Sequence, residues 1–156
     1  MKRTLVLVSL LVLIGAGCSN QASPSPSSQV PAGTTLDLSG RGLTAIPAYV
    51  FSRTELVRLD LSNNKLTGAP QSQIGQLINL TTLDLSDNAL TGLPAELGRL
   101  NKLEVLDVSN NKLTGLPMEL GNLTQLRLLD VSGNSYSKQD LDAIAAKLTS
   151  TEIIKN

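Results

Sequence analysis

Five aspartates recur along the chain at intervals of 23 or 24 residues, and their carboxylates are the groups most able to do chemistry. They are Asp37, Asp60, Asp84, Asp107 and Asp130. Two carboxylates about 5 Å apart can hydrolyse a glycosidic bond, provided that their surroundings drive the two pKa values apart. Five equivalent aspartates offer no such difference, and the chain has no histidine to act as a base or a metal ligand. The sequence therefore predicts neither an enzyme, nor a metal site, nor a cofactor.

The single cysteine, Cys18, ends a leader-like N-terminus. Two basic residues precede an apolar run over residues 5–14, and small residues lead up to the cysteine. The run is shorter than the roughly 20 residues that span a bilayer, so it predicts a signal peptide over residues 1–17. Small residues before a cysteine resemble the lipobox of bacterial lipoproteins, which implies cleavage before Cys18 and a lipid on its thiol. A cleaved signal with an incidental cysteine and an uncleaved anchor remain open.

The next segment, residues 18–32, is rich in serine and proline. It has too few apolar side chains to fold on its own, and its prolines favour extended chain. We therefore expect a lipidated tether that can reach about 45 Å if it is fully extended as polyproline II.

From residue 33 onward, the sequence repeats an eleven-residue pattern. The copies are LVRLDLSNNKL at 56–66, LTTLDLSDNAL at 80–90, LEVLDVSNNKL at 103–113 and LRLLDVSGNSY at 126–136, with a weaker GTTLDLSGRGL at 33–43. This pattern resembles the leucine-rich repeat, L-x-x-L-x-L-x-x-N-x-L. The resemblance implies an α/β solenoid over residues 33–156 with about five repeats, a parallel concave sheet and a convex side of 3₁₀ or short helical segments.

Alternation within each copy explains how the repeat would fold. The two leucines of L-x-L lie on one side of a short strand, so stacked copies share a leucine core while the residue between them faces outward. One asparagine per copy can satisfy backbone groups that the sheet leaves unpaired. A proline then starts each convex segment. The predicted structural ladder comprises Asn64, Asn88, Asn111 and Asn134.

The two ends depart from the pattern. Residues 137–156 predict a C-terminal cap, with Ser137 as the N-cap of a helix and residues 151–156 as a candidate last edge strand. At the N-terminal end, Arg41 replaces the asparagine and Tyr49, Val50 and Phe51 replace leucines. No comparable helix protects that end, so residues 30–32 are a candidate cover.

Equivalent residues should form columns on the concave face. The aspartates form one column, with a column of serines two residues later, and a variable column lies before the first strand leucine. The aspartates are either inherited scaffold or a site for a basic partner or cation, while Val105 and Leu128 predict a small exposed apolar patch. The candidate ligand-binding residues are Arg58, Asp60, Thr82, Asp84, Val105, Asp107, Leu128 and Asp130.

Charge and composition limit the partners. Without Lys2 and Arg3 of the leader, 11 basic and 13 acidic residues leave a net charge of −2, which does not favour nucleic acid. The resemblance implies a protein or peptide ligand on a monomer that is lipid-anchored in a bacterial envelope, at the outer face of the inner membrane or at the outer membrane. A structural envelope protein that binds glycan or peptidoglycan is the alternative, although only 2% of residues are aromatic.

Overall fold

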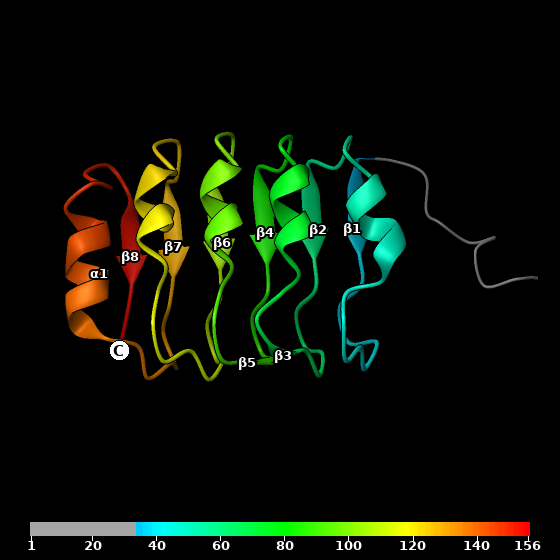
Figure 1. The fold of residues 1–156 in the computed structure, drawn as a ribbon, viewed down its shortest axis with the longest axis horizontal. Coiled ribbons are helices and arrows are strands. Elements are labelled where there is room, and N and C mark those ends of the chain that lie inside the picture. Colours follow the sequence, from blue (N-terminus) through cyan, green and yellow to red (C-terminus); the bar gives the residue numbers. More distant parts are fainter. Residues whose placement is uncertain (1–33) are drawn as a thin grey trace, which may run out of the picture.

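The computed structural model describes residues 34–156, so the predicted leader, Cys18, the tether and the candidate cover at 30–32 lie outside the described residues. The described chain winds into a stack of similar coils, each of which adds one short strand to a single parallel sheet (Figure 1). In order along the sheet, the strands are β1 (Thr35–Asp37), β2 (Arg58–Asp60), β4 (Thr82–Asp84), β6 (Val105–Asp107), β7 (Leu128–Asp130) and β8 (Glu152–Ile154).

The register of the sheet confirms the inside–outside assignment made from the leucines. Neighbouring strands align without a shift, so that Leu83 pairs with Leu106 and Leu106 pairs with Leu129. All three side chains are fully buried. The aspartates align in the same way one residue later, on the opposite side of each strand. The predicted α/β solenoid is therefore confirmed.

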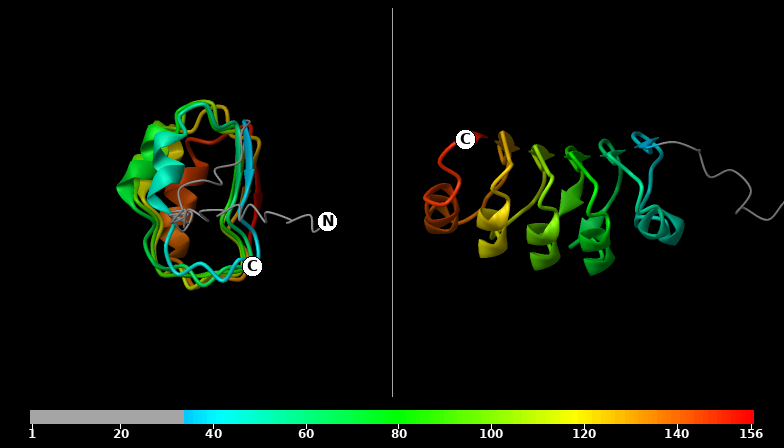
Figure 2. Two further views of the ribbon diagram at one scale, coloured as in Figure 1. Left: turned by 90° about the vertical axis from the view of Figure 1, so that its right-hand side faces the viewer. Right: turned by 90° about the horizontal axis from the view of Figure 1, so that it is seen from above.

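A second layer of 3₁₀ segments packs behind the sheet and forms the outer side of a shallow arc (Figure 2). A proline is the N-cap of three of the segments, as expected, whereas η3 begins after Gln71. The shift arises because this repeat is one residue longer and carries the extra residue just before η3. The segments are η2 (Ala48–Ser52), η3 (Ser72–Gln76), η4 (Ala95–Arg99) and η5 (Met118–Asn122), and a minor sheet of β3 (Thr67–Gly68) and β5 (Ala89–Leu90) lies in the turns.

The asparagine ladder joins successive coils through the backbone, as predicted. The amide oxygen of Asn111 accepts a hydrogen bond from Leu90 N at 3.0 Å. Its nitrogen donates to Leu85 O at 3.0 Å and to Val108 O at 3.1 Å. Asn64, Asn88 and Asn134 make the equivalent contacts in their own coils. Because these side-chain amides form hydrogen bonds with backbone groups that the sheet leaves unpaired, the ladder is structural.

The C-terminal cap consists of the helix α1 (Lys138–Ala145) and the strand β8. Ser137 is the N-cap, and its hydroxyl accepts from Asp140 N at 3.4 Å. Leu141 and Ile144 pack their side chains into the core. The candidate edge strand at 151–156 is confirmed as β8, so the sheet of the described residues has six strands, five from the repeats and one from the cap, and is about 29 Å wide.

The core of the first coil contains side chains other than the leucines of the repeat. Val50 and Phe51 are buried and Tyr49 packs against the core, as expected. Arg53 occupies the position of a core leucine and is only 8% exposed. Its guanidinium makes an ion pair with Glu55, which lowers the pKa of that carboxyl. A charged partner two residues away thus allows an arginine to fill a leucine position at the end of the stack.

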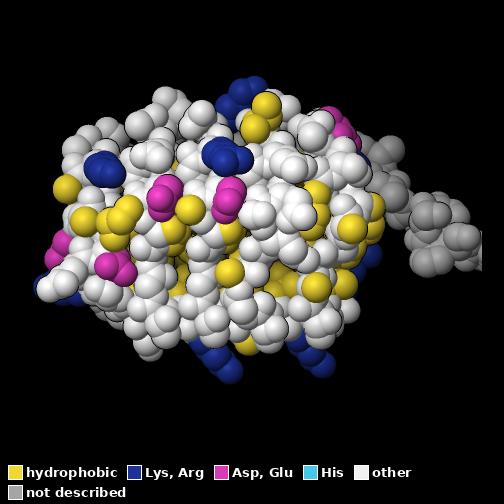
Figure 3. Space-filling model, viewed as in Figure 1, with side chains coloured by type: hydrophobic (Ala, Val, Ile, Leu, Met, Phe, Trp, Pro, Cys, Tyr) yellow, Lys and Arg dark blue, Asp and Glu magenta, His cyan; other side chains and the backbone are white. Residues whose placement is uncertain are grey.

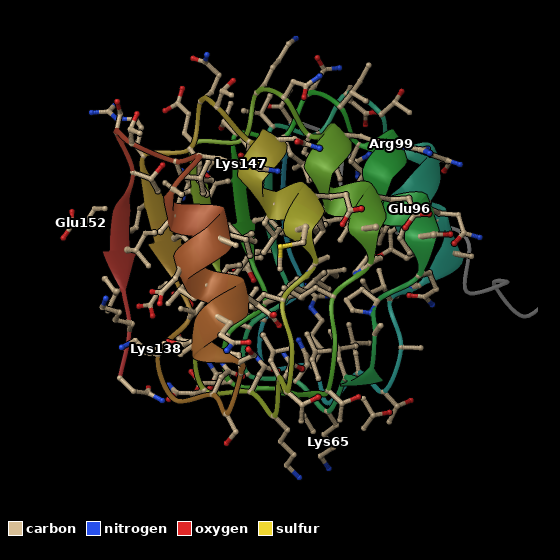
Figure 4. All side chains as sticks on the ribbon, turned by 60° about the vertical axis from the view of Figure 1, so that its left-hand side comes forward. Lys65, Glu96, Arg99, Lys138, Lys147 and Glu152 are labelled. Carbon is tan, nitrogen blue, oxygen red and sulfur yellow. The ribbon has the colours of Figure 1, made fainter. Side chains whose placement is uncertain are left out.

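A column of glycines lets the convex segments approach closely. A Cβ on Gly98 would lie 2.5 Å from the backbone oxygen of Glu119, and one on Gly75 would lie 2.7 Å from that of Glu96. Gly121 makes the same kind of contact with the cap, because a Cβ there would lie 2.6 Å from Cδ of Lys147. Figure 4 shows Lys147 beside η5. At Gly75 and Gly98 a larger side chain would therefore require a shift of the neighbouring coil, whereas at Gly121 it would require the flexible side chain of Lys147 to move.

Candidate binding face

The outer side of the sheet carries two uninterrupted rows of side chains, which we call the acidic row and the variable row. All eight predicted ligand-binding residues lie in these rows, so the structure brings them together on one surface. Sequence columns alone missed the sixth position of each row, which β8 supplies. The acidic row is Asp37, Asp60, Asp84, Asp107, Asp130 and Ile154, and the variable row is Thr35, Arg58, Thr82, Val105, Leu128 and Glu152.

Each aspartate of the acidic row is held by the serine two residues later. In the central coil, Oδ1 of Asp84 accepts from Ser86 N at 2.9 Å and from Ser86 Oγ at 2.6 Å. The other coils repeat the backbone contact. One oxygen thus shapes the turn after the strand. The acidic row is therefore part of the scaffold, and the second carboxylate oxygen of Asp84 accepts no hydrogen bond within the described residues.

The two carboxyls whose pKa values shift in this row move in opposite directions. Burial raises the pKa of Asp107 above its ordinary value of 3.8, against the hydrogen bonds from Ser109, and the charges of Asp84 and Asp130 on either side add to the rise. The side-chain and backbone hydrogen bonds of Ser39 lower the pKa of Asp37, which is exposed at the end of the row. Asp107 is thus harder to ionise than a free aspartate, and Asp37 is easier to ionise.

This difference predicts opposite effects of two substitutions. Because folding raises the pKa of Asp107, its contribution favours the folded state below about pH 3.8 and is lost as pH rises through the folded value. Asp107→Asn cannot ionise and should raise the urea midpoint at pH 7, with no such gain at pH 3. Asp37→Asn should lower the midpoint at pH 7, since the lowered pKa stabilises the fold only above about pH 3.8. Equal changes for both variants would contradict this assignment.

Arg58 is the one basic side chain of the two rows. Its Nη1 donates to Thr82 Oγ1 at 3.3 Å, and it makes no ion pair with any residue from 34 to 156. It lines a hollow of about 190 Å³ together with Asp37, Asp60 and Asp84. Ligand pockets usually measure about 300–1,000 Å³. The hollow is therefore too small to enclose a ligand and suits contact with a surface or an extended chain.

The expected exposed apolar patch is only partly present. Val105 and Leu128 lie side by side in the variable row, but both are half-buried rather than exposed, because each sits between strands whose side chains cover its flanks. Three large apolar side chains of the described residues are more exposed than Val105 and Leu128, namely Ile78, Met118 and Ile154. Of these, Ile154 continues the acidic row. The apolar part of the face is thus displaced toward β8, which the repeat pattern did not include.

The charged side chains on the convex side are scattered and do not form rows. Figure 3 shows acidic and basic side chains scattered among hydrophobic ones on this side. Glu96 and Arg99 project from η4, whereas Glu152 points away from this layer on the far side of the sheet (Figure 4). A hollow of about 330 Å³ lies between η4 and η5, next to Glu96, Arg99 and Glu119. These three residues serve as reference positions for tests of the opposite face.

No group of three or more metal-ligating side chains occurs within residues 34–156. In the same range, no helix has the length and apolar character needed to cross a bilayer. The fold and its rows define a solenoid repeat protein with an open sheet face. A family model described as "Leucine-rich repeat region" matches residues 57–155, and the chain belongs to the leucine-rich-repeat family.

Solved structures support the same assignment. A leucine-rich-repeat protein of Leptospira interrogans is 40% identical, with a TM-score of 0.66 over 70% of this chain and 28% of that chain. The receptor kinase ectodomain GASSHO1/SCHENGEN3 of Arabidopsis thaliana, solved in complex with CASPARIAN STRIP INTEGRITY FACTOR 2, is 32% identical (TM-score 0.62; 71% and 14% covered). The BIR3–SERK2 complex of the same plant is 35% identical (TM-score 0.63; 78% and 66% covered). The chain thus spans less than a third of the length of each of the first two, and a search of curated proteins found no match.

Proposed function

We propose that this protein is a membrane-anchored binding module that presents its outer sheet face to a protein or peptide partner in a bacterial envelope. The observation that carries the proposal is the pair of uninterrupted rows, six positions each, on one open face. Such a face offers contact area without an enclosed cavity, which favours recognition of a partner over catalysis. The proposed role is therefore binding rather than enzymatic.

Two of the similar structures are complexes, one with a named factor and one between two named proteins. We extend the binding of a protein or peptide to the present chain because it shares the fold of these proteins and carries two rows of side chains on its open sheet face. Glycan binding is the weaker alternative, since neither row contains the aromatic side chains on which sugar rings commonly stack. A basic partner fits the acidic row, while Val105, Leu128 and Ile154 supply an apolar contact at one end.

The anchor belongs to the proposal through Cys18 and the serine- and proline-rich segment after it. A lipid on Cys18 would fix the chain to a membrane, and the 15 residues of the tether would hold the solenoid as far as about 45 Å away. A single acyl chain gives only marginal membrane binding, whereas two or more make the attachment stable. The bacterial lipobox resemblance implies more than one chain.

Matched charge substitutions on the two faces test the function. A partner is first captured from envelope extracts, with separate protein and glycan arms. The double variant Asp60→Asn, Asp84→Asn should weaken binding by tenfold or more on an order-of-magnitude estimate for two charged hydrogen bonds, while Glu96→Gln, Glu119→Gln should leave it unchanged. Asparagine keeps the oxygen that accepts from the serine, so the turn is preserved. Binding of wild type should weaken as salt rises, because exposed charges are screened within about 8–10 Å.

The same experiment has two outcomes that would contradict the proposal. Equal losses from the two double variants would show that the rows have no special role. Capture in the glycan arm alone would support the alternative function.

A further inference from the structure

Two neighbouring inner strands of the sheet, β6 and β7, carry apolar and acidic side chains next to one another. Val105 pairs with Leu128 in the variable row, and Asp107 pairs with Asp130 in the acidic row two residues later. We call these four residues the central block, and Figure 1 shows their two strands side by side. All four side chains are half-buried. The block therefore presents an apolar half and a carboxylate half on the same open surface.

The dimensions of the central block fit one long side chain. Neighbouring strands lie about 4.8 Å apart, and residues two positions apart along a strand are separated by about 6.6 Å. A single cation can therefore contact both carboxylates, at a short distance along the strand from both apolar side chains. Lysine and arginine pack their aliphatic stems on apolar surface and carry the charge at the far end. A basic side chain that lies along the strands can thus contact both halves of the block at once.

The carboxylates of the central block can accept further hydrogen bonds. Oδ1 of Asp107 accepts from Ser109 N at 2.9 Å. Oδ1 of Asp130 accepts from Ser132 N at 2.9 Å and from Ser132 Oγ at 2.7 Å, while no residue from 34 to 156 donates to Oδ2 of Asp130. A guanidinium has five N–H donors in a planar fork, whereas the lysine ammonium is a point charge. Two carboxylates on adjacent strands therefore suit arginine better than lysine.

The electrostatics of the block also favour a bound cation. Burial raises the pKa of Asp107, and the charges of Asp84 and Asp130 add to the rise. A cation between Asp107 and Asp130 offsets this repulsion, so the ionised carboxyl gains more from a positive ligand than an isolated surface aspartate does.

The pair of strands β2 and β4 has the same carboxylates but a different variable row. Asp60 pairs with Asp84, and Arg58 pairs with Thr82. Arg58 is exposed, and it lines one hollow together with these two aspartates. A second cation would meet a like charge there and would find a threonine in place of an apolar side chain. The two pairs of strands are therefore unequal sites for a basic ligand.

We propose that the central block binds one arginine side chain of the partner. Its stem packs on Val105 and Leu128, and its guanidinium donates to Asp107 and Asp130. Arg58 keeps the same arginine away from β2 and β4. This inference rests on the proposed function, because it names a residue that the partner presents to the same face.

The first test uses the full ¹⁵N-labelled chain and the probe N-acetyl-glycyl-arginyl-glycinamide, whose only charge is the guanidinium. In a two-dimensional NMR titration, the amide signals of residues 105–109 and 128–132 should move in a saturable manner. The same peptide with citrulline in place of arginine keeps the shape without the charge and should bind about tenfold or more weakly. Equal affinity for the two peptides would remove the role of the carboxylates, and unmoved signals in both segments would place any binding elsewhere.

Matched double variants test which aspartates hold the arginine. Asp107→Asn, Asp130→Asn should weaken binding of the arginine peptide about tenfold or more. Asp60→Asn, Asp84→Asn removes the same charge from β2 and β4 and should bind the peptide like wild type, because a tripeptide, unlike a whole partner, covers one block only. Asparagine keeps an oxygen that can accept from the serine in each turn. Equal losses from the two variants would show attraction to the whole acidic row and would overturn the proposal.

A transplanted block provides a test by gain of binding. The double variant Arg58→Val, Thr82→Leu copies the apolar half of the central block onto β2 and β4, beside Asp60 and Asp84. It should bind two arginine peptides instead of one, with additional movement of the amide signals of residues 58–62 and 82–86. Failure to gain the second site would show that the four residue types of the block are not sufficient, which contradicts the proposal.

The outcomes separate this inference from the proposed function. If the arginine peptide does not bind the central block while the captured partner still depends on the two rows, the inference is wrong and the proposed function stands. If the peptide binds the block while capture from envelope extracts does not depend on the rows, the block is an arginine site and the proposed function is wrong.

Discussion

Leu106→Ala should lower the free energy of unfolding by about 2–5 kcal/mol. Leu106 is fully buried in the central strands, between Leu83 and Leu129. Removing its side chain creates a void that rigid neighbouring coils cannot fill, because each coil is fixed on both sides by sheet and ladder hydrogen bonds. Urea denaturation monitored by circular dichroism measures the change, and Leu85→Ala should behave in the same way.

The control for this substitution lies on the opposite side of the sheet, in the neighbouring strand. Asp84→Asn keeps the oxygen that accepts from Ser86 and removes one charge from the acidic row, so it should be neutral or slightly stabilising. A collapse of the unfolding midpoint in Asp84→Asn, together with an unchanged midpoint in Leu106→Ala, would reverse the inside–outside assignment.

Cys18→Ala should abolish membrane partitioning or leave an unprocessed precursor. The sequence predicts that the mature protein begins at Cys18 and carries lipid there, so removal of the thiol removes the attachment point. Mass spectrometry of the mature N-terminus and fractionation of cells measure both features. Ser19→Ala is the neighbouring control and should change neither. An unmodified cysteine, or cleavage at another position, would exclude the lipoprotein interpretation.

The repeat pattern predicted the interior of the stack because the same physical rule applies in every coil. A leucine between two equivalent leucines is buried whatever ligand the protein binds, and Leu83, Leu106 and Leu129 obey this rule. The ladder asparagines were predictable for the same reason, since each coil leaves the same backbone groups unpaired. Ser137 was predictable as an N-cap because the apolar spacing changes directly after it.

The features that the sequence did not predict depend on neighbours in other coils or on the ends of the stack. Val105 and Leu128 belong to a column that faces outward, yet their exposure depends on how adjacent strands cover them. Arg53 fills a leucine position in the first coil, where its guanidinium makes an ion pair with Glu55. The binding assignments of the two rows remain predictions.

The glycine column bears on how such a chain can grow. Gly75 and Gly98 receive the backbone of the next coil, at Glu96 and Glu119, and Gly121 receives Lys147 of the cap in the same place. The cap thus lies against the same glycine position that the inner coils use, but it places a lysine side chain there instead of a backbone carbonyl. Gain or loss of a whole 23-residue unit would still leave a glycine facing the cap, so the surface on which the terminal helix lies would keep the same lack of a Cβ.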